Sequence, residues 1–102
     1  MSIGATQPFR VAGTATLAAG TVSANVALAG AGEAVLVFNA SAAIAFVRFG
    51  TDASITASVS DTPVPPGGRA LLHVGEYART AAAVLAAGSG NVFFTRGEGT
   101  TY

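Results

Sequence analysis

Turn-forming residues divide this chain into short pieces, and their spacing constrains the fold more than any other feature. Gly, Pro or Asn recurs about every eight to twelve residues along most of the sequence. The pieces between them are rich in residues that favour strands, such as Val, Phe and Thr. Short strands at this spacing are typical of a sandwich or barrel. We therefore predict an all-β protein: a single antiparallel β-sandwich or barrel, jelly-roll-like, of about eight short strands.

The expected strands are the pieces that lie between these turns. They cover residues 9–11, 14–19, 22–29, 34–39, 43–49, 55–59, 70–74, 81–86 and 92–95. Residues 79–87 are rich in Ala, the best helix former, so a short helix is the alternative there. Residues 60–68 contain three prolines, which exclude a central strand. Brief connections such as Gly20-Thr21 predict hairpins, because a parallel crossover needs about a dozen residues or more.

Two segments, residues 33–39 and 43–49, carry most of the expected core. Their side chains alternate between the two faces of a strand, and both faces are mostly apolar. In the second segment one face has Ile44, Phe46 and Arg48, and the other has Ala45, Val47 and Phe49. One face of an antiparallel sheet is usually wet and polar. We therefore expect one face of these strands in the core and the other against a neighbouring subunit.

Charge is scarce in this chain. Only 10% of the residues are charged, and the five basic residues offset the five acidic ones. An ordinary domain is about 25% charged. A neutral surface of small residues favours association, and the centres of interfaces are depleted in charge. The composition therefore predicts a building block of an assembly.

The same composition argues against several other classes of protein. The chain has no excess of basic residues with which to neutralise nucleic-acid phosphates. It has no Cys for disulfides or thiolate metal sites. Gly, Thr, Ser and Asn interrupt its apolar stretches, which argues against a membrane span, and its first residues do not match a secretory signal. We expect no nucleic acid and no membrane as partners, and synthesis in the cytoplasm.

Side chains with catalytic chemistry are few. His73 is the only histidine, and no Gly-x-Ser-x-Gly motif accompanies it, so we expect an outward-facing strand residue. Asp52 and Asp61 sit beside turn residues, where Asp commonly bonds its own backbone, and they give thin support for a calcium site. Tyr77 is expected to cap the core from a loop rather than to contact a sugar. We therefore predict no enzyme, no cofactor and no metal.

Arg48 is the polar residue with the most specific expected role. It shares a strand face with Ile44 and Phe46. Because an unpaired buried charge is strongly destabilising, we expect a structural ion pair with Asp61. A carboxylate of Asp52 or of a neighbouring subunit is an alternative partner, and a side chain that extends to solvent is the other possibility.

Three runs of sequence resemble a known class of protein. The runs are Asn39-Ala-Ser-Ala-Ala-Ile-Ala-Phe-Val-Arg-Phe-Gly50, Ser60-Asp-Thr-Pro-Val-Pro-Pro-Gly67 and Val92-Phe-Phe-Thr-Arg-Gly-Glu-Gly99. In turn chemistry and strand pattern the chain resembles small virion β-proteins of tailed bacteriophages and is similar to capsid decoration (cement) proteins. The resemblance implies a sandwich or barrel on the outside of an icosahedral shell, often as a trimer. It also implies the major capsid protein as partner and a location on the virion, after synthesis in a bacterial host.

Both ends of the chain are expected to extend from the domain as arms. We predict an N-terminal arm at residues 1–8, a β-sandwich domain at 9–99 and a C-terminal tail at 100–102. Contacts with the capsid or with other subunits are expected at Ile3, Phe9, Arg10 and Tyr102. Frayed termini are the alternative.

Two other functions fit a small β-protein of this composition. An adsorption module at a tail or fibre tip would bind a host receptor or glycan, and exposed aromatic residues around Tyr77 would favour it. A tail or head–tail structural subunit would form rings. A flat apolar base would favour capsid decoration instead.

Overall fold

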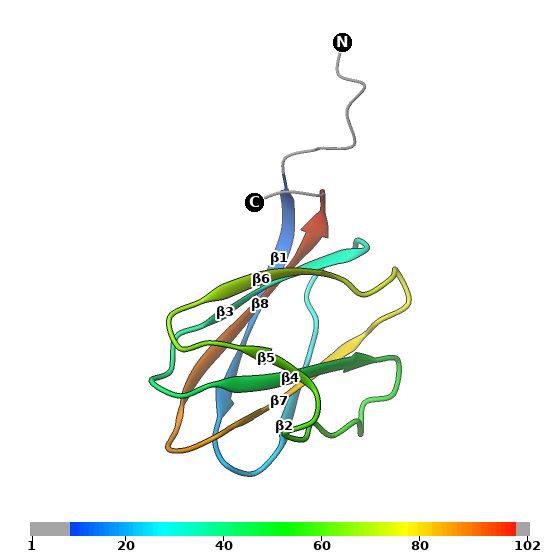
Figure 1. Cartoon of the computed structure of the whole chain (residues 1–102). Coiled ribbons are helices and arrows are strands. Elements are labelled where there is room, and N and C mark those ends of the chain that lie inside the picture. The colour runs from blue at the N-terminus through cyan, green and yellow to red at the C-terminus, as the bar shows by residue number, and fades with distance from the viewer. Residues whose placement is uncertain (1–8, 100–102) are drawn as a thin grey trace.

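A computed structural model of the chain describes residues 9–99, which form two facing β-sheets with no helix among them (Figure 1). The strands are β1 (Arg10–Ala19), β2 (Ala24–Ala27), β3 (Ala34–Asn39), β4 (Ala45–Gly50), β5 (Thr62–Val64), β6 (Arg69–His73), β7 (Thr80–Leu85) and β8 (Gly90–Glu98). One sheet has the order β1-β8-β3-β6 and the other has the order β2-β7-β4-β5. Every pair of neighbouring strands is antiparallel.

The strand pairs are nested within one another. The first strand pairs with the last, β2 with β7, β3 with β6, and β4 with β5. This is one long hairpin that has been rolled up, so that β8 also pairs with β3 and β7 with β4. An eight-stranded double sheet of this kind is a jelly roll. The predicted all-β sandwich of eight strands is therefore confirmed.

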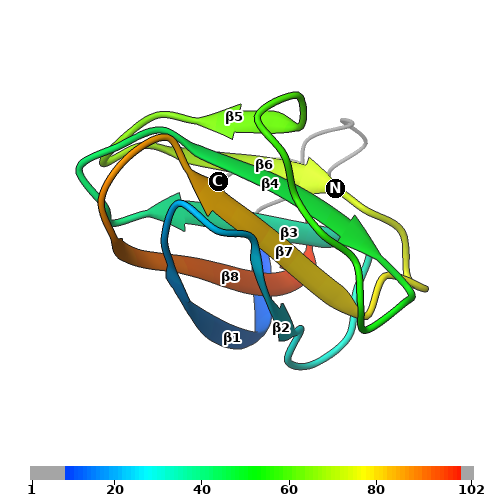
Figure 2. The same cartoon turned by 90° about the horizontal axis from the view of Figure 1, so that it is seen from below.

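The short connections do not form the hairpins that we predicted. Apart from β4 and β5, each strand and its successor in sequence lie in opposite sheets, as the view from below shows (Figure 2). A loop of four or five residues spans the gap of about 10 Å between packed sheets as easily as it closes a hairpin. Loop length alone therefore did not distinguish a hairpin from a change of sheet.

Most predicted strands are present, with one error. Residues 34–39 form β3 as expected, and residues 9–11 and 14–19 merge into β1 through a β-bulge between Val11 and Gly13. The Ala-rich segment is the strand β7, with all six residues buried. The proline-rich segment contributes only β5, at the edge of its sheet. Residues 55–59 form no strand, contrary to our prediction.

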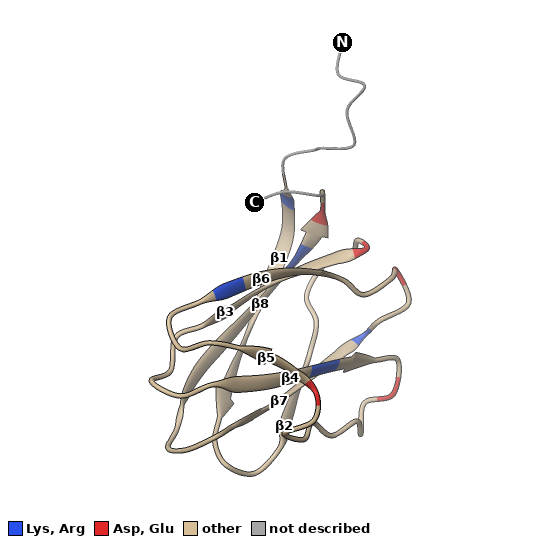
Figure 3. Cartoon of the chain, in the orientation of Figure 1, with Lys and Arg blue, Asp and Glu red and all other residues tan. Residues whose placement is uncertain are grey.

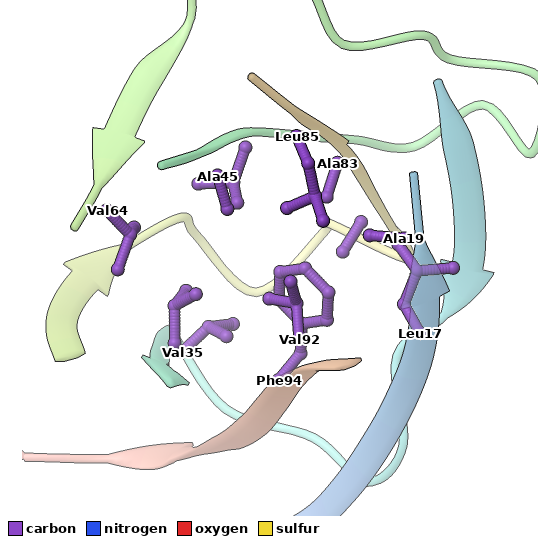
Figure 4. Packing of buried hydrophobic residues seen from close by; sticks show 12 residues of the cluster. Leu17, Ala19, Val35, Ala45, Val64, Ala83, Leu85, Val92 and Phe94 are labelled. Atoms are coloured by element: carbon purple, nitrogen blue, oxygen red, sulfur yellow. The ribbon is translucent and has the colours of Figure 1, made fainter. Parts of the chain in front are cut away.

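The core lies between the two sheets and is made of small and medium apolar side chains (Figure 4). Its buried members are Leu17, Ala19, Val35, Val37, Ala45, Val47, Val64, Ala81, Ala83, Leu85, Val92 and Phe94. Phe94 is fully buried and meets Phe49 edge to face, with ring centroids 5.8 Å apart. As predicted for β4, Ala45, Val47 and Phe49 face this core.

The outer face of the sheet β2-β7-β4-β5 is covered by the chain itself. Ile55 and Ala57, in the segment between β4 and β5, pack against Phe46, Ala82 and Val84. Side chains of β2 and of the loop before it form hydrogen bonds with the backbone of this segment. There the amide of Asn25 donates to the carbonyls of Ala53 and Ile55, and the hydroxyl of Ser23 accepts from the N–H of Ala57. A neighbouring subunit is therefore not needed to cover β4, contrary to our expectation.

Candidate interaction surfaces

The outer face of the other sheet is partly exposed and carries an aromatic pair. Phe38 on β3 and Phe93 on β8 are direct partners across the strands and stack with ring centroids 6.2 Å apart. Phe38 is 39% exposed. Around the pair, Leu36, Leu71, Thr14, Thr16, Thr95 and Arg69 occupy paired positions on β1, β3, β6 and β8. We call this set of eight residues the aromatic face.

The aromatic face is nearly free of charge. Its threonines lie on the strands next to the phenylalanines, and the hydroxyls of Thr14 and Thr95 are hydrogen-bonded at 3.0 Å. Arg69 is its one charged residue. Phe38 lies on the face of residues 33–39 opposite Val35 and Val37, which are in the core. The face offers apolar and hydroxyl contacts.

The end of the sandwich that carries most of the charge is held together by Arg96. We call it the charged end, and it consists of the loops at residues 28–33, 51–61 and 74–79 with the adjacent ends of β1 and β8. Arg96 lies in β8 on the core side and is only 3% exposed. Val92, Phe94 and Arg96 alternate along one face of the strand, and this pattern could have revealed the buried arginine.

Every hydrogen bond of the Arg96 guanidinium goes to a backbone carbonyl. Nε donates to Gly32 at 3.0 Å, and Nη1 donates to Ala78. Nη2 donates to Gly75 at 3.2 Å and to Glu76 at 3.0 Å. Carbonyl dipoles thus take the place of a carboxylate partner, and they join the loop before β3 to the loop before β7.

A pocket of about 170 Å³ lies beside this cluster and is lined by Leu28, Gly30, Ala31, Glu76, Arg79 and Arg96. Because Arg96 is engaged with the backbone, it has little capacity left to bind a ligand there.

The opposite end of the sandwich has loops without any charged residue, and we call it the neutral end. Its loops are residues 20–23, 40–44, 65–68 and 86–89. Figure 3 shows neither blue nor red on these four loops. Arg69, the first residue of β6, is the charge that follows directly on one of them. The side chains here are those of Ala, Gly, Ser, Thr and Pro, with Val22 and Ile44 as the larger apolar residues.

Asn39 holds the loops of the neutral end together. This side chain is fully buried. Its amide nitrogen donates to the carbonyls of Ala43 at 2.7 Å and Val64 at 3.0 Å. Its amide oxygen accepts from the backbone N–H and the hydroxyl of Ser41 at 3.0 and 2.6 Å. Asn39 therefore joins the loop 40–44 to the end of β5, the strand that precedes the loop 65–68.

The residues that we considered for catalysis each contact backbone or serine groups. His73 is exposed, as predicted, and its Nε2 lies 3.1 Å from the carbonyl oxygen of Gly99. Asp52 accepts from the N–H and the hydroxyl of Ser54, and these hydrogen bonds lower the pKa of its carboxyl. Asp61 accepts from the N–H of Ser58. Both aspartates thus bond their own turns, as expected. Within residues 9–99 no group of three or more acidic or His side chains could hold a metal ion.

Two other expectations about side chains were wrong. Arg48 is exposed, and within the described part of the chain it forms no ion pair with Asp61, which instead bonds its own turn. The outward-facing position on β4 lets the guanidinium reach solvent, so no partner is required. Tyr77 is 71% exposed and does not cap the core.

The expected contact residues are only partly within the described range. Ile3 and Tyr102 lie outside it, as do the predicted arm and tail. Phe9 is half-buried, and Arg10 is exposed at the start of β1. Arg10 lines a shallow hollow together with Val11, Ala12, Ala31, Gly97 and Glu98. Val11 is 63% exposed, so this strand end is available for contact.

The fold is a small jelly-roll sandwich of eight strands. Comparisons of the chain with protein-family models, with curated proteins and with solved structures found no match. In the described residues there is no helix long and apolar enough to cross a membrane.

Proposed function

We propose that this chain is a structural virion protein of a tailed bacteriophage, a decoration (cement) protein that binds the outer capsid surface and stabilises the shell. Its partners are the major capsid protein and other copies of itself, in a closed cyclic oligomer such as a trimer. The observation that carries the proposal is the exposed aromatic face. The chain covers one of its outer sheet faces with its own residues 51–61 and leaves this one exposed.

The aromatic face fits a contact with another folded protein. It combines a stacked Phe pair with a nearly uncharged surround, the pattern found at the centre of interfaces. Jelly rolls are also used in viral capsids, although this is an analogy of fold and not of site.

The mechanism is stabilisation by binding. A protein that binds the assembled shell, and not the dissociated subunits, shifts the equilibrium toward the shell by mass action. If one decoration protein contacts two adjacent capsid subunits, dissociation of either must first break those contacts. No residue of the chain needs to react.

Cosedimentation with capsid shells that lack the protein tests this proposal. Wild-type protein should bind the shells saturably. The variant Thr16→Arg places a charge on the aromatic face opposite Phe93 and should weaken shell binding by about tenfold or more. The matched control is Thr56→Arg, on the segment that covers the other sheet, and it should bind like wild type. Equal binding by both variants would rule out the aromatic face, and no binding by wild-type protein would refute the proposal.

A host-adsorption module is the second candidate, and the exposure of Tyr77 favours it. Tyr77 is 71% exposed and follows Glu76, which lines the pocket at the charged end together with Arg79. An exposed aromatic ring beside polar side chains is a common arrangement for stacking on a sugar. Binding of the purified protein to host cells, lost in Tyr77→Ala, together with no binding to shells, would establish this function instead.

A further inference from the structure

We propose that the neutral end is the surface at which copies of this chain meet around a shared symmetry axis. This inference rests on the proposed function only in that it takes the protein to be a self-associating subunit. The contact is formed by the loops 20–23, 40–44, 65–68 and 86–89, and the charged end points away from the axis.

The charge distribution favours copies of the same chain as the partner. Near a symmetry axis each residue approaches its own counterpart, so every charge there meets a charge of the same sign. Like charges brought together in an interface cost several kcal/mol. The four loops of the neutral end carry no charge, so they can approach their own copies without this penalty. At the charged end Glu33, Glu76 and Arg79 are exposed and would face their counterparts.

The neutral end is also rigid before any partner arrives. Asn39 bonds the backbone of the loop 40–44 and the strand β5 that precedes the loop 65–68. The N–H of Gly67 donates to the carbonyl of Asn39 at 2.8 Å, and the N–H of Ala40 donates to Asn91 at 3.0 Å. The loop 20–23 is tied to β7 by the hydrogen bond from Leu85 to Gly20 at 2.7 Å. A surface that is already ordered loses little conformational entropy on association.

The side chains at this end suit close approach. Ala, Gly and Ser predominate, so backbones of neighbouring copies can come near one another. Val22, 80% exposed, and Ile44, 41% exposed, supply the apolar area that a contact would bury. Removing such side chains from water is the main driving force for association. The rigid, uncharged loops and the exposed apolar residues thus lie on the same end of the molecule.

Cysteine cross-linking tests the placement directly, because the natural chain has no Cys. Thr21→Cys puts a thiol on an exposed position of the neutral end, and Thr51→Cys puts one on an exposed position of the charged end. Under mild oxidation at a concentration where the protein is associated, Thr21→Cys should form disulfide-linked dimers rapidly. Thr51→Cys should form them only at the rate of random collision. Equal rates, or faster cross-linking of Thr51→Cys, would overturn the assignment.

Introduced charge gives a second readout. Val22→Glu should weaken self-association by about 100-fold, because identical carboxylates would meet at the axis. Tyr77→Glu, at a site of similar exposure on the charged end, should leave the oligomer mass unchanged in light scattering. Circular dichroism should show that both variants are folded, since neither site is buried. An unchanged mass for Val22→Glu would contradict the inference.

These experiments separate the inference from the proposed function. A protein that is monomeric at every concentration but still binds shells would overturn the neutral-end contact and leave the decoration function intact. An oligomer that cross-links through Thr21→Cys but does not bind shells would support the contact and refute decoration. If the protein is monomeric and Val22→Glu abolishes shell binding, the partner at the neutral end is the capsid and the inference is wrong.

Discussion

The two ends of this sandwich solve the same structural problem with different side chains. At each end one buried polar residue bonds the backbone of loops that are far apart in the sequence. At the neutral end it is Asn39, which both donates and accepts. At the charged end it is Arg96, which only donates, to four carbonyls. The surrounding loops differ in the same way, since one set carries no charge and the other carries five of the ten charged residues.

The difference shows how a chain with few charges distributes them. An amide brings no net charge into the protein, so the loops around Asn39 can be uncharged throughout. A guanidinium is always charged, and Arg96 brings its charge to an end where other charged groups already lie in solvent. The chain thereby keeps one end neutral while the other remains well hydrated. In our account the neutral end faces other subunits and the charged end faces water.

The largest predicted effect on the free energy of unfolding comes from replacing Arg96. Arg96→Met leaves the carbonyls of Gly32, Gly75 and Ala78 without their donor and should lower the free energy of unfolding by about 3–5 kcal/mol. Arg96→Lys should recover little of this, because an ammonium cannot reach the same set of carbonyls. Urea denaturation followed by circular dichroism measures both. The control is Arg79→Met at the same end, where the exposed side chain should contribute within about 0.5 kcal/mol.

The loss of Asn39 should be the next largest effect. Asn39→Ala removes the donor to Ala43 and Val64 and the acceptor of Ser41, and should cost about 2–3 kcal/mol in the same assay. The cost is smaller than for Arg96 because Asn39 is neutral, and hydrogen bonds that involve a charged group contribute more. Asn91→Ala, an exposed asparagine of the adjacent strand β8, should change stability by less than about 0.5 kcal/mol. A cost for Asn39→Ala above that for Arg96→Met would reverse the comparison.

Replacing a glycine where two backbones lie close together should also destabilise the charged end more than the neutral end. Gly32 has φ +136°, and a Cβ there would lie 2.3 Å from the carbonyl oxygen of Gly97. A Cβ on Gly90, at the neutral end, would lie 2.5 Å from the Cβ of Ser41. Gly32→Ala should therefore destabilise by about 3 kcal/mol and Gly90→Ala by about 1–2 kcal/mol. Gly20→Ala, with nothing closer than 3.9 Å, is the control for thermal unfolding.

The smallest predicted effect is a loss of stabilisation at Asp52 as the pH falls. The N–H and hydroxyl of Ser54 lower the pKa of Asp52, at the charged end, so the stabilisation by these hydrogen bonds is fully present above the ordinary Asp pKa of about 3.9. It is lost as the pH falls through the lowered pKa. Ser54→Ala should raise the pKa of Asp52 toward its ordinary value in an NMR titration. The loops of the neutral end contain no group that titrates in this range, and their chemical shifts should stay constant.

Sequence patterns predicted the strands far better than the contacts that organise the ends. The alternation that places Val35 and Val37 on one face indicates a core strand whichever strands pair with it, so β3 was predictable. The role of Arg96 depends on Gly32, which is 64 residues away and reaches it only through the rolled topology. Ile55 and Ala57 alternate with polar residues as in a strand, yet their segment lies over the outer face of a sheet. Its backbone is hydrogen-bonded by the side chains of Asn25 and Ser23 instead of by neighbouring strands.

Amide hydrogen exchange tests the contrast between the two ends most directly. We would compare the associated wild-type protein with the Val22→Glu variant, which we expect to dissociate. The account predicts stronger protection in the associated protein at residues 20–23, 40–44 and 86–89, and unchanged exchange at 74–79 on the charged end. Protection that appears at 74–79 instead, or no difference anywhere between the two proteins, would contradict it.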